Sequence, residues 1–200
     1  MKVPERIKVF VEVFTGLPGI GPRQAIRLAF HFMRRGEAFI GTGIRALELL
    51  RSLKPCAACF YAHDGAAELC ELCADPSRDR SQIAIVEKET DLLSMEEAGK
   101  FRGRYFILGD LRKNGVLEAH QKLRLQSLKE RILRELGGSA SEIIVALNPT
   151  TYGDLNADIV AKELASFAKK ISRLGRGIPT GGEIEFADPE TLGEAIEKRG

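Results

Sequence analysis

The first fifty residues place apolar side chains at the spacing of amphipathic helices. Near the start of the chain, four apolar positions recur three or four residues apart, which aligns them on one helical face. They are Ile7, Phe10, Val11 and Phe14. A turn rich in Gly and Pro at 15–21 ends this helix, and Pro22 is expected to open a second one, because the first helical turn does not use the amide hydrogen that proline lacks. The positions of Ile44, Leu47 and Leu50 predict a third helix.

The pattern changes beyond about residue 75, where short apolar runs alternate with segments of helical period. The runs are predicted as buried strands and the segments between them as helices. The predicted strands are 82–86, 105–108, 142–147 and 170–174, and the predicted helices are 91–98, 122–136 and 155–169. A last helix is expected with Asp188 as its cap and Pro189 at its first position. This alternation predicts an α/β fold with a mainly parallel sheet.

The same pattern divides the chain into four regions. They are a helical region at 1–54, a cysteine-rich segment at 55–76, an α/β domain at 77–172, and a short C-terminal tail at 173–200 with a Gly-rich segment and a helix. With 200 residues, of which 44% are hydrophobic, the chain is long enough for one sizeable core, or for one core and a small satellite.

Charge and hydropathy narrow the classes of partner. No apolar run approaches the roughly 18 residues that a membrane span needs, and the charged start does not resemble a signal peptide, so we expect a cytoplasmic protein with no membrane partner. The formal net charge of +2 excludes a polycation that binds nucleic acid over its whole surface. Any contact with DNA must therefore come from a local basic patch.

The four cysteines carry the most specific pattern in the chain. Cys56 and Cys59 form one C-x2-C pair, and Cys70 and Cys73 form a second pair after ten intervening residues. Two such knuckles complete the closed tetrahedron of a structural zinc site, which has no open position for catalysis. Free buried thiols and a redox pair are the alternatives. His63 lies between the knuckles, but four thiolates already suffice for one ion.

The turn between the first two helices resembles a helix-hairpin-helix DNA-binding element. Gly19 and Gly21 lack a Cβ, so their backbone N–H groups can approach a phosphate at the start of the second helix. Arg23 and Arg27 lie one turn apart on that helix, where both could contact one phosphate backbone. These features predict DNA binding without sequence preference; the alternative is an ordinary turn between packed helices.

Two acidic residues stand where open parallel sheets place ligands. Glu87 directly follows the predicted strand 82–86, and its position resembles the first acidic position of a Toprim domain. Asp154 follows the predicted strand 142–147. Enzymes with this domain hold Mg²⁺ through a further acidic cluster, and here no Asp-x-Asp pair follows. We expect Glu87 and Asp154 to line a cleft or a partner surface, with a two-carboxylate Mg²⁺ site as the alternative.

The order of these elements resembles the bacterial recombination-mediator family RecR along the whole chain. Matching phrases are Leu-Pro-Gly-Ile-Gly-Pro-Arg at 17–23, Asn-Pro-Thr at 148–150, and Gly-Ile-Pro at 177–179 followed by Gly-Gly-Glu-Ile-Glu-Phe-Ala-Asp at 181–188. The resemblance implies a protein without catalysis that acts in recombinational DNA repair. It also implies RecO and RecF as partners in placing RecA on single-stranded DNA, a homodimer or a ring-shaped homotetramer, and association with the nucleoid.

The resemblance assigns roles residue by residue. It implies zinc ligation by the four cysteines, DNA contact by Arg23 and Arg27, and docking of RecO or RecF near Glu87 and Asp154. The chain departs from the family at Tyr152, where relatives usually carry an acidic residue, and at 110–115. Two other classes remain open: a Toprim nuclease or primase-like enzyme that uses Mg²⁺, and a zinc-ribbon interaction module without DNA affinity.

Overall fold

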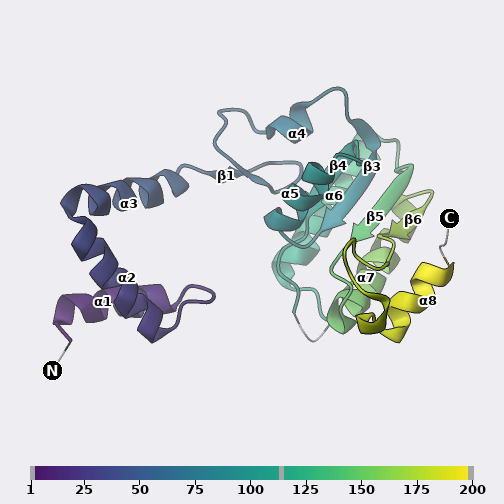
Figure 1. The fold of residues 1–200 in the computed structure, drawn as a ribbon. Helices are drawn as coiled ribbons and strands as arrows, with labels where there is room; N and C mark the ends of the chain where they lie inside the picture. Colours follow the sequence, from purple (N-terminus) through teal and green to yellow (C-terminus); the bar gives the residue numbers. More distant parts are fainter. Residues whose placement is uncertain (1–2, 113–114, 198–200) are drawn as a thin grey trace. The chain divides into compact units, whose positions relative to one another are not determined.

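The structure is a computed structural model that describes residues 3–112 and 115–197, so part of the departing segment 110–115 lies outside the described residues. By its internal contacts the chain divides after Leu53 into an N-terminal unit and a C-terminal unit (Figure 1). The boundary lies just before the cysteine-rich segment. The cysteine cluster and the α/β sheet therefore belong to one unit, and the Gly-Pro turn to the other.

The N-terminal unit consists of three helices. They are α1 (Glu5–Thr15), α2 (Pro22–Arg35) and α3 (Glu37–Leu50). The fully buried Ala25 lets α1 and α2 pack closely, and the ring of Phe10, which stacks on Phe14, also contacts the ring of Phe32 in α2. The predicted third helix forms, but its apolar residues are solvent-exposed within this unit: Ile44, Leu47 and Leu50 are all more than half exposed.

The C-terminal unit is built on a four-stranded parallel sheet, as the alternation of strands and helices predicted. The strands are β3 (Asp79–Val86), β4 (Gly103–Ile107), β5 (Glu142–Ala146) and β6 (Ile171–Arg173), in the order β4-β3-β5-β6. Every pairing in this sheet is parallel. β3 and β5 are therefore central, and their carboxyl ends, where Glu87 and Asn148 follow, meet at one edge of the sheet.

Helices cover both faces of this sheet, which Figure 1 shows as three layers. Side chains at alternate positions of β3 point to opposite faces. Ile83 and Ile85 pack against the helices α6 (Ala119–Glu135) and α7 (Thr151–Leu164). Ala84 and Val86 pack against α5 (Glu89–Ala98) and part of the cysteine-rich segment. Strands buried on both faces explain the continuous apolar runs in the sequence.

The cysteine-rich segment is small and has little regular structure. It contains the antiparallel pair β1 (Lys54–Pro55) and β2 (Ala62–His63) and the one-turn helix α4 (Glu71–Ala74). Phe60, the only described non-glycine residue with positive φ (66°), packs edge to face on Phe106 of β4. The segment is thus anchored to the sheet by an aromatic contact as well as by the chain itself.

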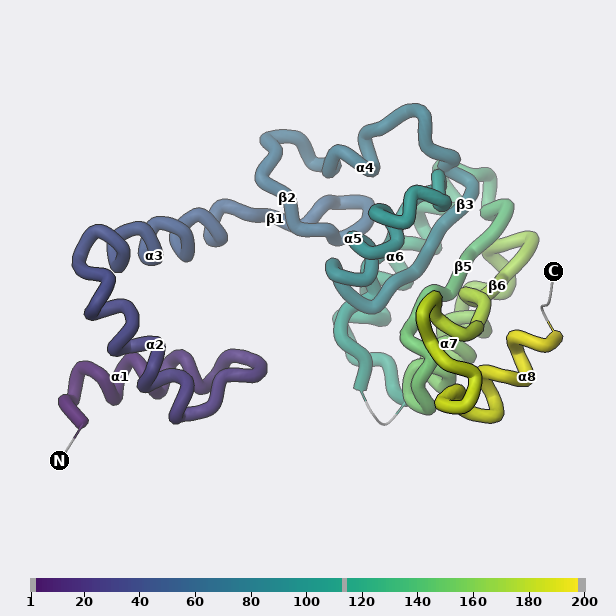
Figure 2. Tube along the Cα trace, in the orientation of Figure 1, coloured from purple at the N-terminus to yellow at the C-terminus, as the bar shows by residue number. Residues whose placement is uncertain are grey.

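After β6 the chain turns back toward α7 before it forms the last helix, a path that Figure 2 shows in yellow. This C-terminal segment contains the short 3-10 helix η2 (Ile184–Phe186) and α8 (Pro189–Glu197); another 3-10 helix, η1 (Ala165–Phe167), extends α7. The carboxylate of Asp188 accepts a hydrogen bond from the Thr191 amide at 2.9 Å, which is the predicted cap. None of the described helices has the length and apolar character needed to cross a membrane.

Candidate functional site

The four cysteines converge at one point of the C-terminal unit. Their sulfur atoms all lie within 4.8 Å of one another, and each cysteine is at most 3% exposed. None of the four forms a disulfide. A tetrahedral thiolate site with metal–sulfur bonds of about 2.3 Å needs sulfur atoms about 3.8 Å apart, so the cluster has the right size for one ion. His63 is not part of the cluster among the described residues.

Two of the sulfur atoms lie within hydrogen-bond distance of backbone amides. Backbone amides donate to them: Cys70 N lies 3.3 Å from Cys56 Sγ, and Tyr61 N lies 3.4 Å from Cys59 Sγ. Without a metal the thiols compete for charge, because the hydrogen bond between Cys59 and Cys70 raises the pKa of Cys59 and lowers that of Cys70. A bound cation removes this competition by stabilising all four thiolates together. The residues present therefore fit a closed, structural metal centre.

The first cysteine knuckle also covers the free edge of the sheet. β4 is an edge strand, and the Ile107 amide on its outer side donates to Cys59 O at 2.9 Å. Arg124 of α6 lies over the ring of Phe60, 4.6 Å from its centroid, and donates to Ile107 O at 3.0 Å. An uncovered edge strand offers its backbone to other chains. The metal-binding segment therefore completes the sheet as well as its own small core.

The Gly-Pro turn of the N-terminal unit has the shape that the sequence predicted. Gly19 has φ +75°, a conformation that favours glycine, and Gly21 is the extended residue that precedes α2. A Cβ built on either glycine meets nothing within 4 Å, so the turn is open on this side. Arg23 and Arg27 are exposed on the first turns of α2. The unit therefore presents an amide-rich helix start and two cations on one surface.

Glu87 binds the chain itself at the carboxyl end of the sheet. One carboxylate oxygen accepts from the Leu111 amide at 3.0 Å, and the other accepts from Asn148 Nδ2 at 3.0 Å. These bonds connect the segments that follow β3, β4 and β5. Gly153, in the first turn of α7, approaches so closely that a Cβ there would lie 1.9 Å from Asn148 O. Glu87 thus connects tightly packed loops at the carboxyl ends of the strands.

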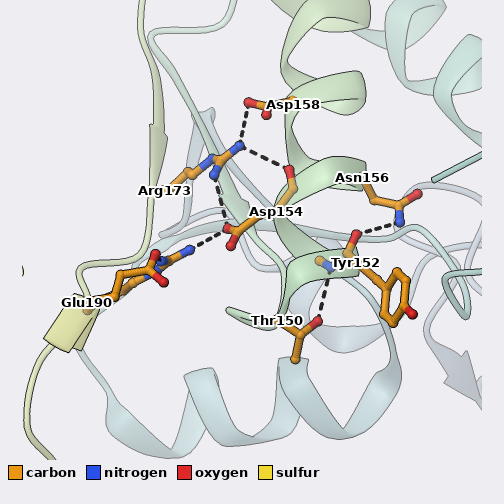
Figure 3. A network of polar contacts seen from close by, with 9 residues as sticks. Thr150, Tyr152, Asp154, Asn156, Asp158, Arg173 and Glu190 are labelled. Carbon is orange, nitrogen blue, oxygen red and sulfur yellow. Dashed lines mark hydrogen bonds and ion pairs between the residues drawn. The ribbon is translucent and has the colours of Figure 1, made fainter. Parts of the chain in front are cut away.

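Asp154 is held by two arginines from the segment after α7 (Figure 3). Its carboxylate accepts from Arg173 at 3.2 Å and also from Arg176, and Arg173 contacts Asp158 at 2.7 Å. The hydrogen bond with Asp154 raises the pKa of Arg176. Arg176 also pairs with Glu190 at the start of α8, so this network fastens the C-terminal segment to α7. Among the described residues, the carboxylates of Glu87 and Asp154 share no hydrogen-bond partner.

A cavity of about 600 Å³ lies beside this network. Its walls combine Thr150 and Asp154 of the α7 start with Arg173, Arg176 and residues of the α8 start. Figure 3 shows the ring of Tyr152 pointing away from Asp154. Tyr152 is 46% exposed, so its side chain belongs to the neighbouring surface rather than to the contacts of Asp154.

Known proteins with a similar sequence decide the family. A family model described as Toprim domain matches residues 81–175, and another described as RecR, C-terminal matches 177–199. Recombination protein RecR of Chloroflexus aurantiacus is 38% identical over 192 residues, which cover 94% of this chain and 91% of that protein. The chain belongs to the RecR family. Recombination protein RecR of Frankia casuarinae is 37% identical over 92% of this chain and 90% of the relative, and that of Deinococcus radiodurans is 37% identical over 100% and 88%.

Several charged residues make contacts in the structure that were not predicted from the sequence. Arg131 and Arg104 are buried, and Arg131 donates to Ala58 O in the cysteine-rich segment. Arg173 and Arg176 hold Asp154. The burial of Arg131 could have been predicted from its position in the helical pattern. Arg131 follows Leu128 by three residues and precedes Ile132 in the buried stripe of α6, a position where an arginine indicates a buried charge.

Removal of the metal should expose the edge of β4. The Ile107 amide depends on Cys59 O, whereas the next amide, Leu108, donates to Val86 O inside the sheet. We expect chelation under reducing conditions to accelerate hydrogen exchange at Ile107 by at least about tenfold and to leave Leu108 protected. Exchange measured residue by residue by NMR tests this. Equal protection of both amides after complete metal removal would contradict the role of the knuckle as an edge cover.

Proposed function

We propose that this chain is a non-catalytic recombination mediator that binds DNA and helps RecO, with RecF where present, to load RecA onto single-stranded DNA. The main support for DNA binding is the open glycine turn, beside which Arg23 and Arg27 are exposed at the start of α2. Backbone amides at a helix start and flanking arginines bind phosphates without reading bases. Membership in a family of recombination proteins supports the same role.

We propose zinc as the ion of the four-cysteine cluster. Soft thiolate ligands select zinc, copper(I) or iron–sulfur clusters, and a closed set of four cysteines in two C-x2-C pairs is typical of structural zinc. All four positions are filled by sulfur atoms of Cys56, Cys59, Cys70 and Cys73. Zinc would hold the knuckle on the sheet and leave no coordination position for water or a substrate.

The contacts of the acidic residues favour a mediator over an enzyme. A Mg²⁺-dependent nuclease would need free carboxylate oxygens that converge on one ion. Both oxygens of Glu87 accept hydrogen bonds from the chain, and Asp154 faces Arg173 and Arg176. We infer that Glu87 shapes the docking surface, that Asp154 provides its charge, and that a basic segment of RecO competes there with the two arginines.

We further propose that the protein acts in the cytoplasm at the nucleoid as a homodimer or a ring-shaped homotetramer. The support is the family assignment together with exposed apolar side chains on elements at both ends of the chain, such as Leu47 of α3 and Phe186 of η2. Light scattering of the purified protein, with and without a DNA duplex, measures the mass of the assembly. A monomer under both conditions would refute the ring.

Substitution of both hairpin arginines should weaken DNA binding and reduce its dependence on salt. In Arg23→Ala/Arg27→Ala we expect the affinity for any duplex to fall by at least about tenfold, and the slope of log affinity against log salt to decrease by about 2, since each phosphate contact contributes about 0.9. Fluorescence anisotropy at several salt concentrations measures both quantities.

The matched control is Arg6→Ala/Arg34→Ala. It removes the same charge from the opposite ends of the two helices that form the hairpin, where both residues are exposed. We expect this variant to retain most of the affinity and the salt slope. Equal effects of the two double variants would show that the turn has no special role and would favour the interaction-module alternative.

Neutralisation of Asp154 should weaken the RecO complex. We expect Asp154→Asn to lower the affinity for RecO about tenfold, because it removes the charge that a basic partner would contact. Asp158→Asn is the matched control, since it changes the same helix and a carboxylate bound by the same Arg173. Calorimetric titration measures both affinities. The docking assignment is wrong if Asp154→Asn binds RecO as tightly as the control.

A further inference from the structure

Two buried arginines, Arg131 and Arg104, line the same small cavity, and Arg131 also contacts the cysteine segment. Arg131 of α6 is 8% exposed and Arg104 of β4 is 6% exposed. An isolated cation in the protein interior costs several kcal/mol, so buried arginines need negative partners. The next question is which negative groups compensate the charges of these two arginines.

Among the described residues, one carboxylate serves both arginines. The carboxylate of Glu135 lies 3.6 Å from the guanidinium of Arg104, and its negative charge also favours the charged form of Arg131. Arg104 Nε and one terminal nitrogen of Arg131 are buried without a hydrogen-bond partner. The cavity beside them has a volume of about 10 Å³, which is about the size of one water molecule and too small for an anion such as phosphate. The cavity therefore has no room for a bound anion that would supply a second negative charge.

The cysteine cluster is in position to supply it. Arg131 donates to Ala58 O, which lies between Cys56 and Cys59 in the first knuckle. Burial lowers the pKa of Arg131, whereas negative charge on Cys73, Glu135 and Cys59 acts in the opposite direction. Four thiolates around one divalent cation leave two negative charges in excess. A metal-loaded cluster would thus place negative charge beside the knuckle that Arg131 contacts.

We propose that Arg131, supported by Arg104, is the built-in counter-charge of the thiolate–metal centre. The guanidinium holds the knuckle through Ala58 O and stabilises the loaded centre electrostatically, so that metal affinity depends on a residue of α6 that is not a ligand. This inference rests on the proposed metal binding. Groups that surround metal ligands commonly change the affinity for the metal by 10- to 100-fold.

Metal affinity of the full-length chain tests the proposal. Zn²⁺ is titrated in competition with a chromophoric chelator, and Co²⁺ absorption reports whether four sulfur atoms bind the ion. We expect Arg131→Gln, which removes the charge and shortens the side chain, to weaken Zn²⁺ binding at least about tenfold. Arg131→Lys, which keeps the charge, should lie closer to the parent chain. Lys122→Met is the control, since it removes an exposed cation from the same helix.

A second variant changes the affinity in the opposite direction. Glu135 is 34% exposed in its side chain, so Glu135→Gln is expected to fold, and it removes the anion that competes with the cluster for the arginines. We expect it to bind Zn²⁺ several-fold more tightly. Parent-like affinity in Arg131→Gln, or unchanged or weaker binding in Glu135→Gln, overturns the counter-charge role. Failure of the parent chain to bind any metal would instead refute the metal assignment itself.

Discussion

Four buried sulfur atoms within 4.8 Å of one another impose the constraint on which the C-terminal unit depends. Thiolates this close repel one another unless a cation lies between them, so the closed cluster is suited to form around a metal ion. Because Cys59 O holds the outer amide of β4, the same event decides whether the sheet has a covered edge. The cysteine-rich segment is thus part of the α/β domain rather than an independent finger.

The proposed functional surfaces lie on elements that the cores hold in place. The glycine turn is fixed by the close packing of α1 and α2 around Ala25, and its arginines remain free for phosphates. Glu87 ties together the segments after three strands, and Asp154 fastens the C-terminal segment through arginines. Basic residues are exposed at the glycine turn, and the acidic residues Glu87 and Asp154 lie in the other unit. A local basic surface of this kind agrees with a net charge of only +2 in a protein proposed to bind DNA.

The periodic patterns predicted most of the architecture, since strand and helix spacing and the two C-x2-C pairs are local properties of the chain. The parallel sheet, the three N-terminal helices and the convergence of the cysteines were all predictable on this basis. Asp154 was not understood from the sequence, because its arginines follow 19 and 22 residues later and only the fold brings them back. The burial of Arg131 likewise depends on which segment packs against α6, and helical period alone does not specify that.

The role proposed for this chain is to promote loading of a recombinase without catalysing a reaction of its own. The most direct test measures RecA assembly on single-stranded DNA coated with single-strand-binding protein, with RecO present and this chain added or omitted. We expect the chain to shorten the delay before RecA filaments form and to leave the DNA uncleaved in the presence of Mg²⁺. An unchanged delay, or cleavage that requires Glu87 and Asp154, would contradict it.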